Sequence, residues 1–327
     1  MGRSYWTARD RARLNAGHRI ASRPGQAQSQ QQRQAQMDEL WKLSATELGR
    51  RYRKGSLRPS QALEAVLARA QTVDAVANIF ATRDFDGARK AAQESDARFA
   101  AGAPAGSLDG IPVTIKDNIP VKDLRCAWGS QLYLDKVPSA DELPVARMRA
   151  KGAVILGKTN VSEFTLGRGN VDSIAFGTTR NPWNPELTTG SSTGGGAAAA
   201  GSGAGPIALG TDGGGSIRRP AGYNNLIGLK PTVGRVARID GLPPILHDFE
   251  VIGPLARTVD DAALTLAAIE GPDPLDRSSY GFAPGRIEEV RKRLRILYVP
   301  QLGGMQVEEP IARSCAAAAA NLAAMGH

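Results

Sequence analysis

The chain of 327 residues is poor in histidine, with only His18, His247 and His327. Hydrolases that activate a serine or cysteine through an imidazole need a third group to hold that imidazole. His18 lies in an expected tail and His327 ends the sequence, so only His247 is a candidate. The shortage of histidine therefore predicts that any covalent catalysis uses a different base.

Cysteine and aromatic residues are also scarce. Cys126 and Cys315 cannot build a disulfide framework, and the sequence has no Cys/His cluster with the spacing of a structural zinc site. We therefore expect a reducing, cytoplasmic location, and neither a metal nor another cofactor. Aromatic residues make up 5% of the chain against 37 glycines, so small side chains are expected to do much of the packing.

Acidic residues are nearly missing from the first part of the chain. Residues 1–36 hold seven arginines and one acidic residue, Asp10, so they account for six of the nine excess positive charges. A nucleic-acid surface would need basic residues spread over the folded part, so we expect no nucleic-acid partner. Residues 1–36 also contain a glutamine-rich stretch and lack apolar periodicity. They are predicted to be a disordered extension of a folded domain at 37–327, with a targeting segment as the alternative.

Charge is absent from residues 187–211, a run of 25 positions that is long enough to span a bilayer. Fifteen of these positions are Gly, Ser or Thr, so the hydrophobic transfer energy is too small for stable insertion. We therefore expect no membrane-spanning helix.

Helical and strand-like segments alternate from Met37 onward. Ser44 followed by Glu47 is typical of a capping box that starts a short helix through Arg53. Further helices are predicted to start at Pro59 and to cover 84–101, 143–151, 258–270 and 308–326, with strands at 111–115, 153–156, 206–210 and 295–299. This alternation predicts an α/β fold with a mixed or parallel sheet.

Residues 190–216 contain eleven glycines in 27 positions, and three interpretations compete. A phosphate-binding loop would need a lysine near its second glycine, but no lysine occurs between Lys158 and Lys230. A flexible linker is the second interpretation, although the strand-like residues 206–210 lie inside the segment. The third is a nucleophile site at Ser216.

Gly213, Gly214 and Gly215 directly before Ser216 permit a tight turn. Their amides and that of Ser216 could point at one oxygen and form an oxyanion hole, in which each donor contributes about 3–4 kcal/mol of transition-state stabilisation. Ser216 would be the attacking hydroxyl. The alternative is that Ser216 only caps the following helix.

A serine nucleophile needs a base, and Lys116 at the end of an apolar strand is the candidate. Burial favours the neutral amine, and lowering a lysine pKa from ~10.4 to near 7 corresponds to about 4–5 kcal/mol, which burial can supply. The alternative is an ordinary surface charge.

Several motifs occur in one order and together resemble the amidase signature family over roughly residues 40–327. They are Gly110–Asn118, Gly157–Asn160, Phe176–Trp183, the serine-glycine run 190–196, Gly210–Arg218 and Gly228–Thr232. The resemblance implies a mixed central β-sheet covered by helices on both faces. It also implies hydrolysis of a small-molecule amide by a Ser–cis-Ser–Lys triad.

The resemblance assigns a role to individual residues. Ser216 matches the family nucleophile, Lys116 the base and Ser192 the bridging serine in a cis peptide, with Ser191 where the family usually has glycine. The supporting residues that it implies are Thr193, Asp212 and Arg218. Lys158 and Lys230 also stand in family motifs and are expected to be structural. A Ser-His-Asp site built on His247 and Asp248 is the rival mechanism.

Family members usually continue beyond the point where this sequence stops, so the resemblance predicts a C-terminally truncated domain. The alternatives to a stand-alone amide hydrolase are an inactive fragment that acts as a binding module and an amidotransferase-type subunit. In each case the chain could form a homodimer.

Overall fold

The computed structural model describes residues 39–167, 169–243, 245–246, 249–282 and 293–327. The chain divides into two compact units, residues 1–284 and 285–327, and each is described by itself. The predictions for residues 1–36 and for the pair His247 and Asp248 lie outside the described residues.

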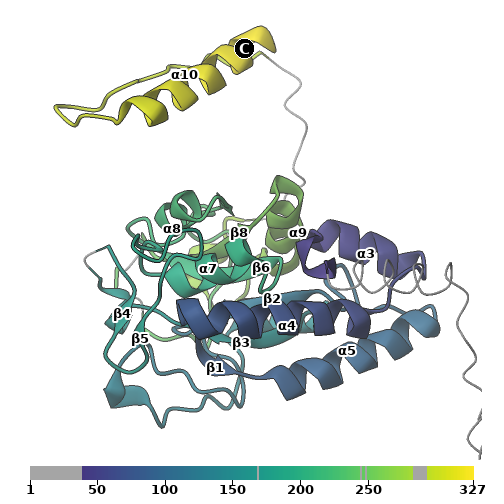
Figure 1. Cartoon of the computed structure of the whole chain (residues 1–327). Helices are drawn as coiled ribbons and strands as arrows, with labels where there is room; N and C mark the ends of the chain where they lie inside the picture. Colours follow the sequence, from purple (N-terminus) through teal and green to yellow (C-terminus); the bar gives the residue numbers. More distant parts are fainter. Residues whose placement is uncertain (1–38, 168, 244, 247–248, 283–292) are drawn as a thin grey trace, which may run out of the picture. The chain divides into compact units, whose positions relative to one another are not determined.

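The larger unit is built around a sheet in the order β1-β3-β2-β6-β8-β7 (Figure 1). β3 and β6 run parallel to the central strand β2, whereas β1 and β8 pair antiparallel with β3 and β6. Its strands are β1 (Phe80–Arg83), β2 (Pro112–Lys116), β3 (Val154–Thr159), β6 (Ile207–Asp212), β7 (Ile227–Gly228) and β8 (Val251–Ala256), with a separate hairpin of β4 (Asp172–Ser173) and β5 (Gly177–Thr178). The predicted mixed sheet is confirmed.

The helices begin where the sequence offers caps. The Ser44 hydroxyl accepts the Glu47 amide at 3.1 Å, and the Asp84 carboxylate accepts the Gly87 amide at 3.1 Å. The helices of this unit are α3 (Ala45–Arg53), α4 (Pro59–Ala77), α5 (Phe85–Ala100), α6 (Leu143–Ala150), α7 (Gly194–Ser202), α8 (Arg218–Tyr223) and α9 (Val259–Ile269), with short 3-10 turns at Leu40–Lys42, Gln131–Tyr133, Glu163–Thr165 and Arg277–Ser279. Five predicted helices are confirmed here, those realised as α3, α4, α5, α6 and α9.

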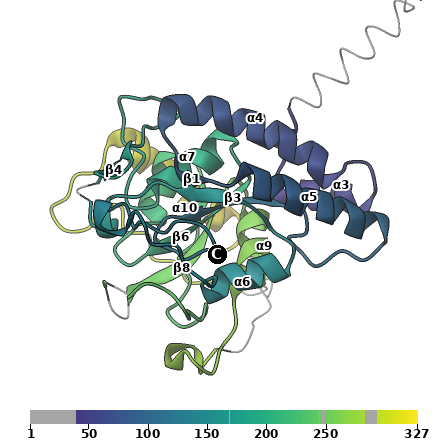
Figure 2. The same ribbon diagram turned by 90° about the horizontal axis from the view of Figure 1, so that it is seen from below.

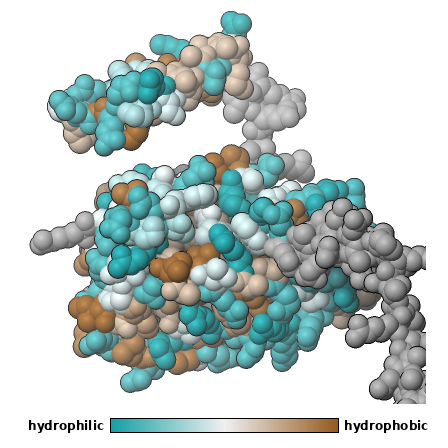
Figure 3. All heavy atoms as spheres, viewed as in Figure 1, coloured by the Kyte–Doolittle hydropathy of each residue, from teal (hydrophilic) through white to brown (hydrophobic). Residues whose placement is uncertain are grey.

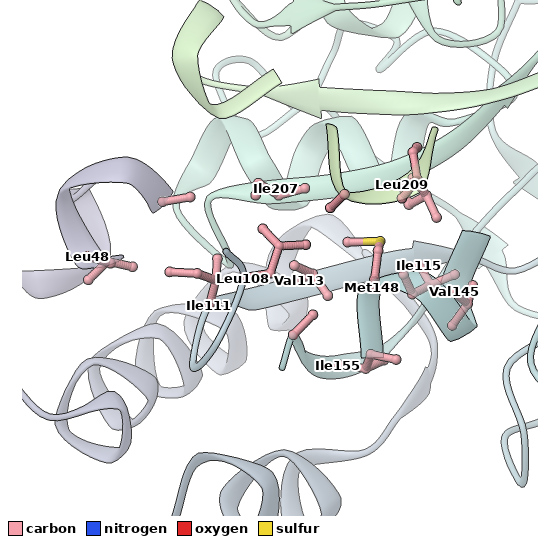
Figure 4. Close-up of a cluster of buried hydrophobic side chains, with 14 of the residues drawn as sticks. Leu48, Leu108, Ile111, Val113, Ile115, Val145, Met148, Ile155, Ile207 and Leu209 are labelled. Atoms are coloured by element: carbon pink, nitrogen blue, oxygen red, sulfur yellow. The ribbon is translucent and has the colours of Figure 1, made fainter. Parts of the chain in front are cut away.

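Apolar side chains alternate along the strands, so each face of the sheet has its own core. Val154 and Leu156 of β3 pack with α4, α5 and α7, whereas Ile155 faces a second core with α3, α6 and α9. Figure 2 shows the sheet between α4 and α7 on one side and α6 and α9 on the other. Figure 4 shows how Val145 and Met148 of α6 meet strand residues of the second core. Helices therefore cover both faces, as predicted.

Two local differences from the sequence prediction have clear physical reasons. α7 was not predicted, because three glycines in a row disfavour an isolated helix, yet α7 is almost wholly buried against β2 and β6. The predicted strand at 295–299 is wrong: these residues have no regular secondary structure. A strand needs a hydrogen-bonded neighbour, and the described residues of the smaller unit contain none.

The smaller unit consists, in its described part, of an irregular segment followed by α10 (Glu309–Ala324), which confirms the predicted C-terminal helix. Within the described residues, no helix is both long and apolar enough to cross a bilayer.

Candidate active site

Lys116 is the last residue of β2, and its side chain is fully buried. Because β2 and β6 are parallel, their carboxyl ends meet at one edge of the sheet, where Thr211 and Asp212 end β6. The Lys116 Nζ lies 2.8 Å from Ser192 Oγ, 2.7 Å from Thr211 Oγ1 and 3.2 Å from the Thr211 carbonyl oxygen. Lys116 is therefore no surface charge, and its contacts are all neutral oxygens.

Burial lowers the pKa of the Lys116 amine to about 7, because an ammonium at this position loses its hydration. The charges of Glu250 and Asp212 act in the opposite direction, and the nearby Arg238 lowers the pKa further. A lysine with this pKa is substantially neutral near pH 7, so it can accept a proton there.

Ser192 reaches Lys116 from the segment that leads into α7. The peptide bond between Ser191 and Ser192 is cis, and Ser192 is buried. The following glycines allow this segment to lie against neighbouring backbone: a Cβ on Gly195 would stand 2.5 Å from the carbonyl oxygen of Asn160. The glycines of the run thus let the start of α7 approach the sheet edge where Lys116 lies.

Ser216 stands in the turn between β6 and α8. Its carbonyl accepts the Thr193 amide at 3.3 Å, which ties this turn to the segment that holds Ser192. α8 begins at Arg218 without a side-chain cap, so Ser216 does not cap it. Within the described part of the chain, the Ser216 hydroxyl makes no hydrogen bond. The structure thus brings Lys116 and Ser192 into direct contact and joins the backbone of Ser216 to Thr193, the residue after Ser192.

The buried carboxylate of Asp212 organises the turn. It accepts the amides of Gly215 at 2.7 Å and Ile217 at 3.0 Å, and the Arg218 guanidinium at 3.0 Å. Burial alone would raise the pKa of Asp212, but the hydrogen bonds from Arg218 and from the backbone hold it at about 2. Asp212 and Arg218 are therefore not an ordinary surface ion pair.

One amide of the predicted oxyanion hole, that of Gly215, has a partner within the turn. Because the Gly215 amide donates to Asp212, it is not directed at a substrate oxygen. The amides of Gly213, Gly214 and Ser216 are the remaining candidates. Gly214 has open space beside its Cα, with no heavy atom within 4 Å of an added Cβ.

Two contacting residues were missed by the sequence analysis. Thr211 contacts Lys116 with both its hydroxyl and its carbonyl oxygen, and the Asn118 amide donates to the same hydroxyl at 3.2 Å. Both residues stand inside quoted motifs, Gly210–Arg218 and Gly110–Asn118. Their position in those motifs was a usable signal, but only the pairing of β2 with β6 makes them neighbours.

Thr193 and the two motif lysines make contacts within the fold. Thr193 precedes α7, and its hydroxyl donates to the Thr211 carbonyl at 3.3 Å. Lys158 is fully buried and donates to the Asp117 carbonyl at 3.0 Å. Lys230 donates to the carbonyl of Pro231 at 3.3 Å.

A cavity of about 480 Å³ opens beside Arg238 and is also lined by Glu142 and Glu250. The Arg238 guanidinium donates to Glu142 at 2.7 Å and lies 3.5 Å from Glu250. None of the three candidate catalytic side chains lines this cavity. The charges of Glu250 and Arg238 therefore act on the pKa of Lys116 at a distance, not by direct contact. Among the described residues, no group of His, Cys, Asp and Glu is placed to hold a metal ion.

Comparisons with known proteins place the chain in a family. A family model described as Amidase matches residues 61–327. The chain is 44% identical over 240 residues to the glutamyl-tRNA(Gln) amidotransferase A subunit of Roseiflexus castenholzii, a match that covers 73% of this chain and 48% of that protein. The chain spans about half the length of the curated relatives it matches.

Solved structures give the same result. The peptide amidase of Stenotrophomonas maltophilia is 37% identical, with a TM-score of 0.68, over 74% of this chain and 50% of that one. A bacterial aryl acylamidase of the amidase signature family is 32% identical, with a TM-score of 0.68, over 72% and 49%.

Proposed function

Since the chain belongs to the amidase signature family, as its motifs suggested, we propose that it hydrolyses a carboxylic amide to an acid and ammonia or an amine through an acyl-Ser216 intermediate. The observation that carries this proposal is the buried lysine with a lowered pKa in contact with a serine hydroxyl. Such a pair is the base and proton carrier that a serine nucleophile needs where histidine is absent.

The contacts of Lys116 fit a neutral amine whose lone pair points toward the Ser192 hydroxyl. A neutral amine has two N–H groups and one lone pair. If the hydroxyl and carbonyl oxygens of Thr211 accept the two N–H bonds, the lone pair is left to accept the Ser192 proton. Thr211 would thus orient the base.

The proposed reaction begins with a relay. Ser192 gives its proton to Lys116 and takes the proton of Ser216, whose oxygen attacks the amide carbon. The amides of Gly213, Gly214 and Ser216 stabilise the oxyanion. The relay returns a proton to the leaving nitrogen, and water then cleaves the acyl-enzyme. The relay requires the two serine hydroxyls to come within hydrogen-bond reach when substrate binds.

The test combines labelling with turnover. The purified chain is incubated with a serine-directed fluorophosphonate, and mass spectrometry identifies the labelled residue. We expect label on Ser216, loss of label in Ser216→Ala, and ammonia release from at least one primary amide. The His247→Ala variant should keep its turnover. Absence of both label and amide hydrolysis would instead support an inactive fragment that acts as a binding module.

A second candidate follows from the curated relatives, which are named as amidotransferase A subunits. In that case the same relay would release ammonia from an amide for use by a partner protein. Hydrolysis of glutamine in preference to other amides, and enhancement by a copurifying partner, would favour this candidate over a stand-alone hydrolase.

A further inference from the structure

A second cavity, of about 660 Å³, lies where α3 ends, α4 begins and α5 ends, and we call it the α3–α5 cavity. Its size falls within the range of small-molecule sites in proteins. The lining residues come from two short stretches of the chain, 52–59 and 96–104. Gly55 and Gly102 are among them, and a Cβ added to either would have no heavy atom within 4 Å. The turns that follow α3 and α5 therefore leave open space at the cavity.

The α3–α5 cavity lies at the opposite end of β2 from Lys116. Pro59 lines the cavity and packs against Gly110, since a Cβ on Gly110 would stand 2.6 Å from the Pro59 Cγ. Gly110 precedes β2, whereas Lys116 is the last residue of β2. A strand rises about 3.3 Å per residue, so the length of β2 alone separates the two places by about 13 Å. Neither Ser192 nor Ser216 lines the cavity, which is therefore distinct from the candidate active site.

The inner part of the α3–α5 cavity is apolar. Tyr52 and Leu57 are 2% and 7% exposed, and the centroid of the Phe99 ring lies 5.7 Å from that of Tyr52. By contrast, the outer surface of α5 is mainly hydrophilic (Figure 3). The exposed residues along this helix include Asp86, Lys90, Gln93 and Glu94. The cavity thus offers buried apolar side chains beside a polar surface, as a site for an apolar group does.

The outer part of the α3–α5 cavity is basic. Arg53, Lys54 and Arg58 all line it and are exposed. Within the described part of the chain none of these three side chains forms an ion pair. Arg51, earlier in α3, does form one, with Glu47 at 2.6 Å. The basic side chains at the cavity are therefore free to bind an anion.

One carboxylate, that of Asp96, also lines the α3–α5 cavity, and it already has partners. Its two oxygens accept the Ser60 amide at 3.0 Å and the Ser60 hydroxyl at 2.5 Å. Three basic side chains against one carboxylate leave the lining with a positive excess. Arginine and lysine form charge-assisted hydrogen bonds with anionic groups. The charge of the lining thus favours a ligand that carries a negative charge.

From this arrangement we propose that the α3–α5 cavity is a binding site for a small organic anion with an apolar body. The apolar body lies against Tyr52, Leu57 and Phe99, and the basic side chains at the outer part hold the anionic group. This proposal does not depend on the proposed function of Ser216, because the cavity is separate from the candidate active site.

Calorimetry with three naphthalene probes tests the proposal on the native chain. The probes are 1-naphthaleneacetate, which is anionic, 1-naphthaleneethanol, which is neutral, and 1-naphthylmethylammonium, which is cationic. We expect one naphthaleneacetate per chain, bound at least about tenfold more tightly than the alcohol, because charged partners strengthen the hydrogen bonds. The ammonium should bind most weakly. Added salt should reduce the difference between the anion and the alcohol.

Variants locate the binding within the chain. Lys54→Glu combined with Arg58→Glu should remove the preference for the anion and leave the affinity for the alcohol unchanged. Phe99→Ala should weaken the binding of both probes. Lys90→Glu is the matched control, because Lys90 is an exposed lysine of α5 that does not line the cavity, and it should keep the preference. Circular dichroism checks that each variant is folded.

Ser216→Ala separates this proposal from the proposed reaction. This variant should bind naphthaleneacetate as tightly as the native chain, even if the native chain cleaves no amide. A loss of affinity in Ser216→Ala would place the anion in the candidate active site and overturn the proposal. No binding of naphthaleneacetate, equal affinities for the three probes, or a preference for the anion that survives Lys54→Glu with Arg58→Glu would overturn it as well.

Discussion

Two lysines on neighbouring strands lie in the interior of this protein, and their surroundings differ. Lys116 on β2 and Lys158 on β3 lie on paired parallel strands, and both side chains are fully buried. Lys158 has a carboxylate oxygen of Asp117 at 3.8 Å. Lys116 contacts only hydroxyl and carbonyl oxygens.

The difference teaches that two equally buried lysines can have different partners. Lys158 has a carboxyl group within 4 Å, and Lys116 makes no such contact. Neutral oxygens can orient an amine without stabilising its charge to the same extent, so desolvation lowers the pKa of Lys116 to about 7. The neutral partners and the lowered pKa are the grounds on which we propose Lys116 as the base.

The largest expected loss of activity comes from removing Lys116. Lys116→Ala should lower kcat/KM for the best amide by about 10³–10⁴-fold, since it removes the general base. Steady-state kinetics measure this loss, and circular dichroism checks that the variant is folded. A reduction below tenfold would sink the proposed role of Lys116.

Lys158→Met is the matched variant and should affect stability instead. It removes the amine that donates to the Asp117 carbonyl at 3.0 Å and lies 3.8 Å from the buried Asp117 carboxyl group, which should lower the free energy of unfolding by roughly 3–5 kcal/mol. Urea denaturation measures this change. If Lys158→Met were stable but as inactive as Lys116→Ala, the distinction between the two lysines would be lost.

Ser192→Ala should cost less than removal of the base, about 10²–10³-fold in kcat/KM, because Lys116 remains but its proton path to Ser216 is interrupted. Labelling of Ser216 by the fluorophosphonate should slow in parallel. Ser191→Ala serves as the control, and full activity of Ser192→Ala would contradict the relay.

The pH dependence follows from the lowered pKa of Lys116. The acylation rate should rise with pH and level off above about 7, falling about tenfold per pH unit below it. The free energy of unfolding should also rise with pH. Between about 7 and the unfolded value near ~10.4, the unfolded chain binds a proton that the folded chain lacks, so the free energy of unfolding rises with pH. Lys116→Met should flatten this rise, and an unchanged pH profile of stability in that variant would assign the titration to another group.

The smallest effect is expected for Thr211→Val, which keeps the shape of the side chain but removes the hydroxyl 2.7 Å from Lys116. Loss of one hydrogen bond corresponds to about 1 kcal/mol, so kcat should fall about three- to tenfold. The carbonyl of residue 211 remains as the second acceptor. A change in KM with unchanged kcat would show that Thr211 does not orient the base.

Local sequence rules predicted much of the fold because they act over short distances. The cap at Ser44 and the alternation of Ile111, Val113 and Ile115 were readable and are realised in α3 and β2. The helix α7 was not readable, because its stability comes from burial against β2 and β6 rather than from its glycines. The strand expected at 295–299 does not form, because a strand needs a neighbouring strand to hydrogen-bond with and these residues have none among the described residues of their unit.

The sequence indicated individual residues of the candidate site, but not the hydrogen bonds between them. The motifs indicated Lys116, Ser192 and Ser216. They did not indicate that Thr211 contacts Lys116, that Asn118 donates to the Thr211 hydroxyl, or that Asp212 accepts the Gly215 amide. These contacts depend on which strands pair and on where the β6 turn ends.

The order of residues along the chain determined which chemistry is available: scarce histidine, a lysine at the end of an apolar strand, and glycines before a serine. Such features are local, so the sequence displays them directly. Only the tertiary structure decided which lysine is surrounded by neutral oxygens and which faces a carboxylate. Protonation of a buried amine depends on the groups within a few ångströms, and folding alone brings these together from distant parts of the chain.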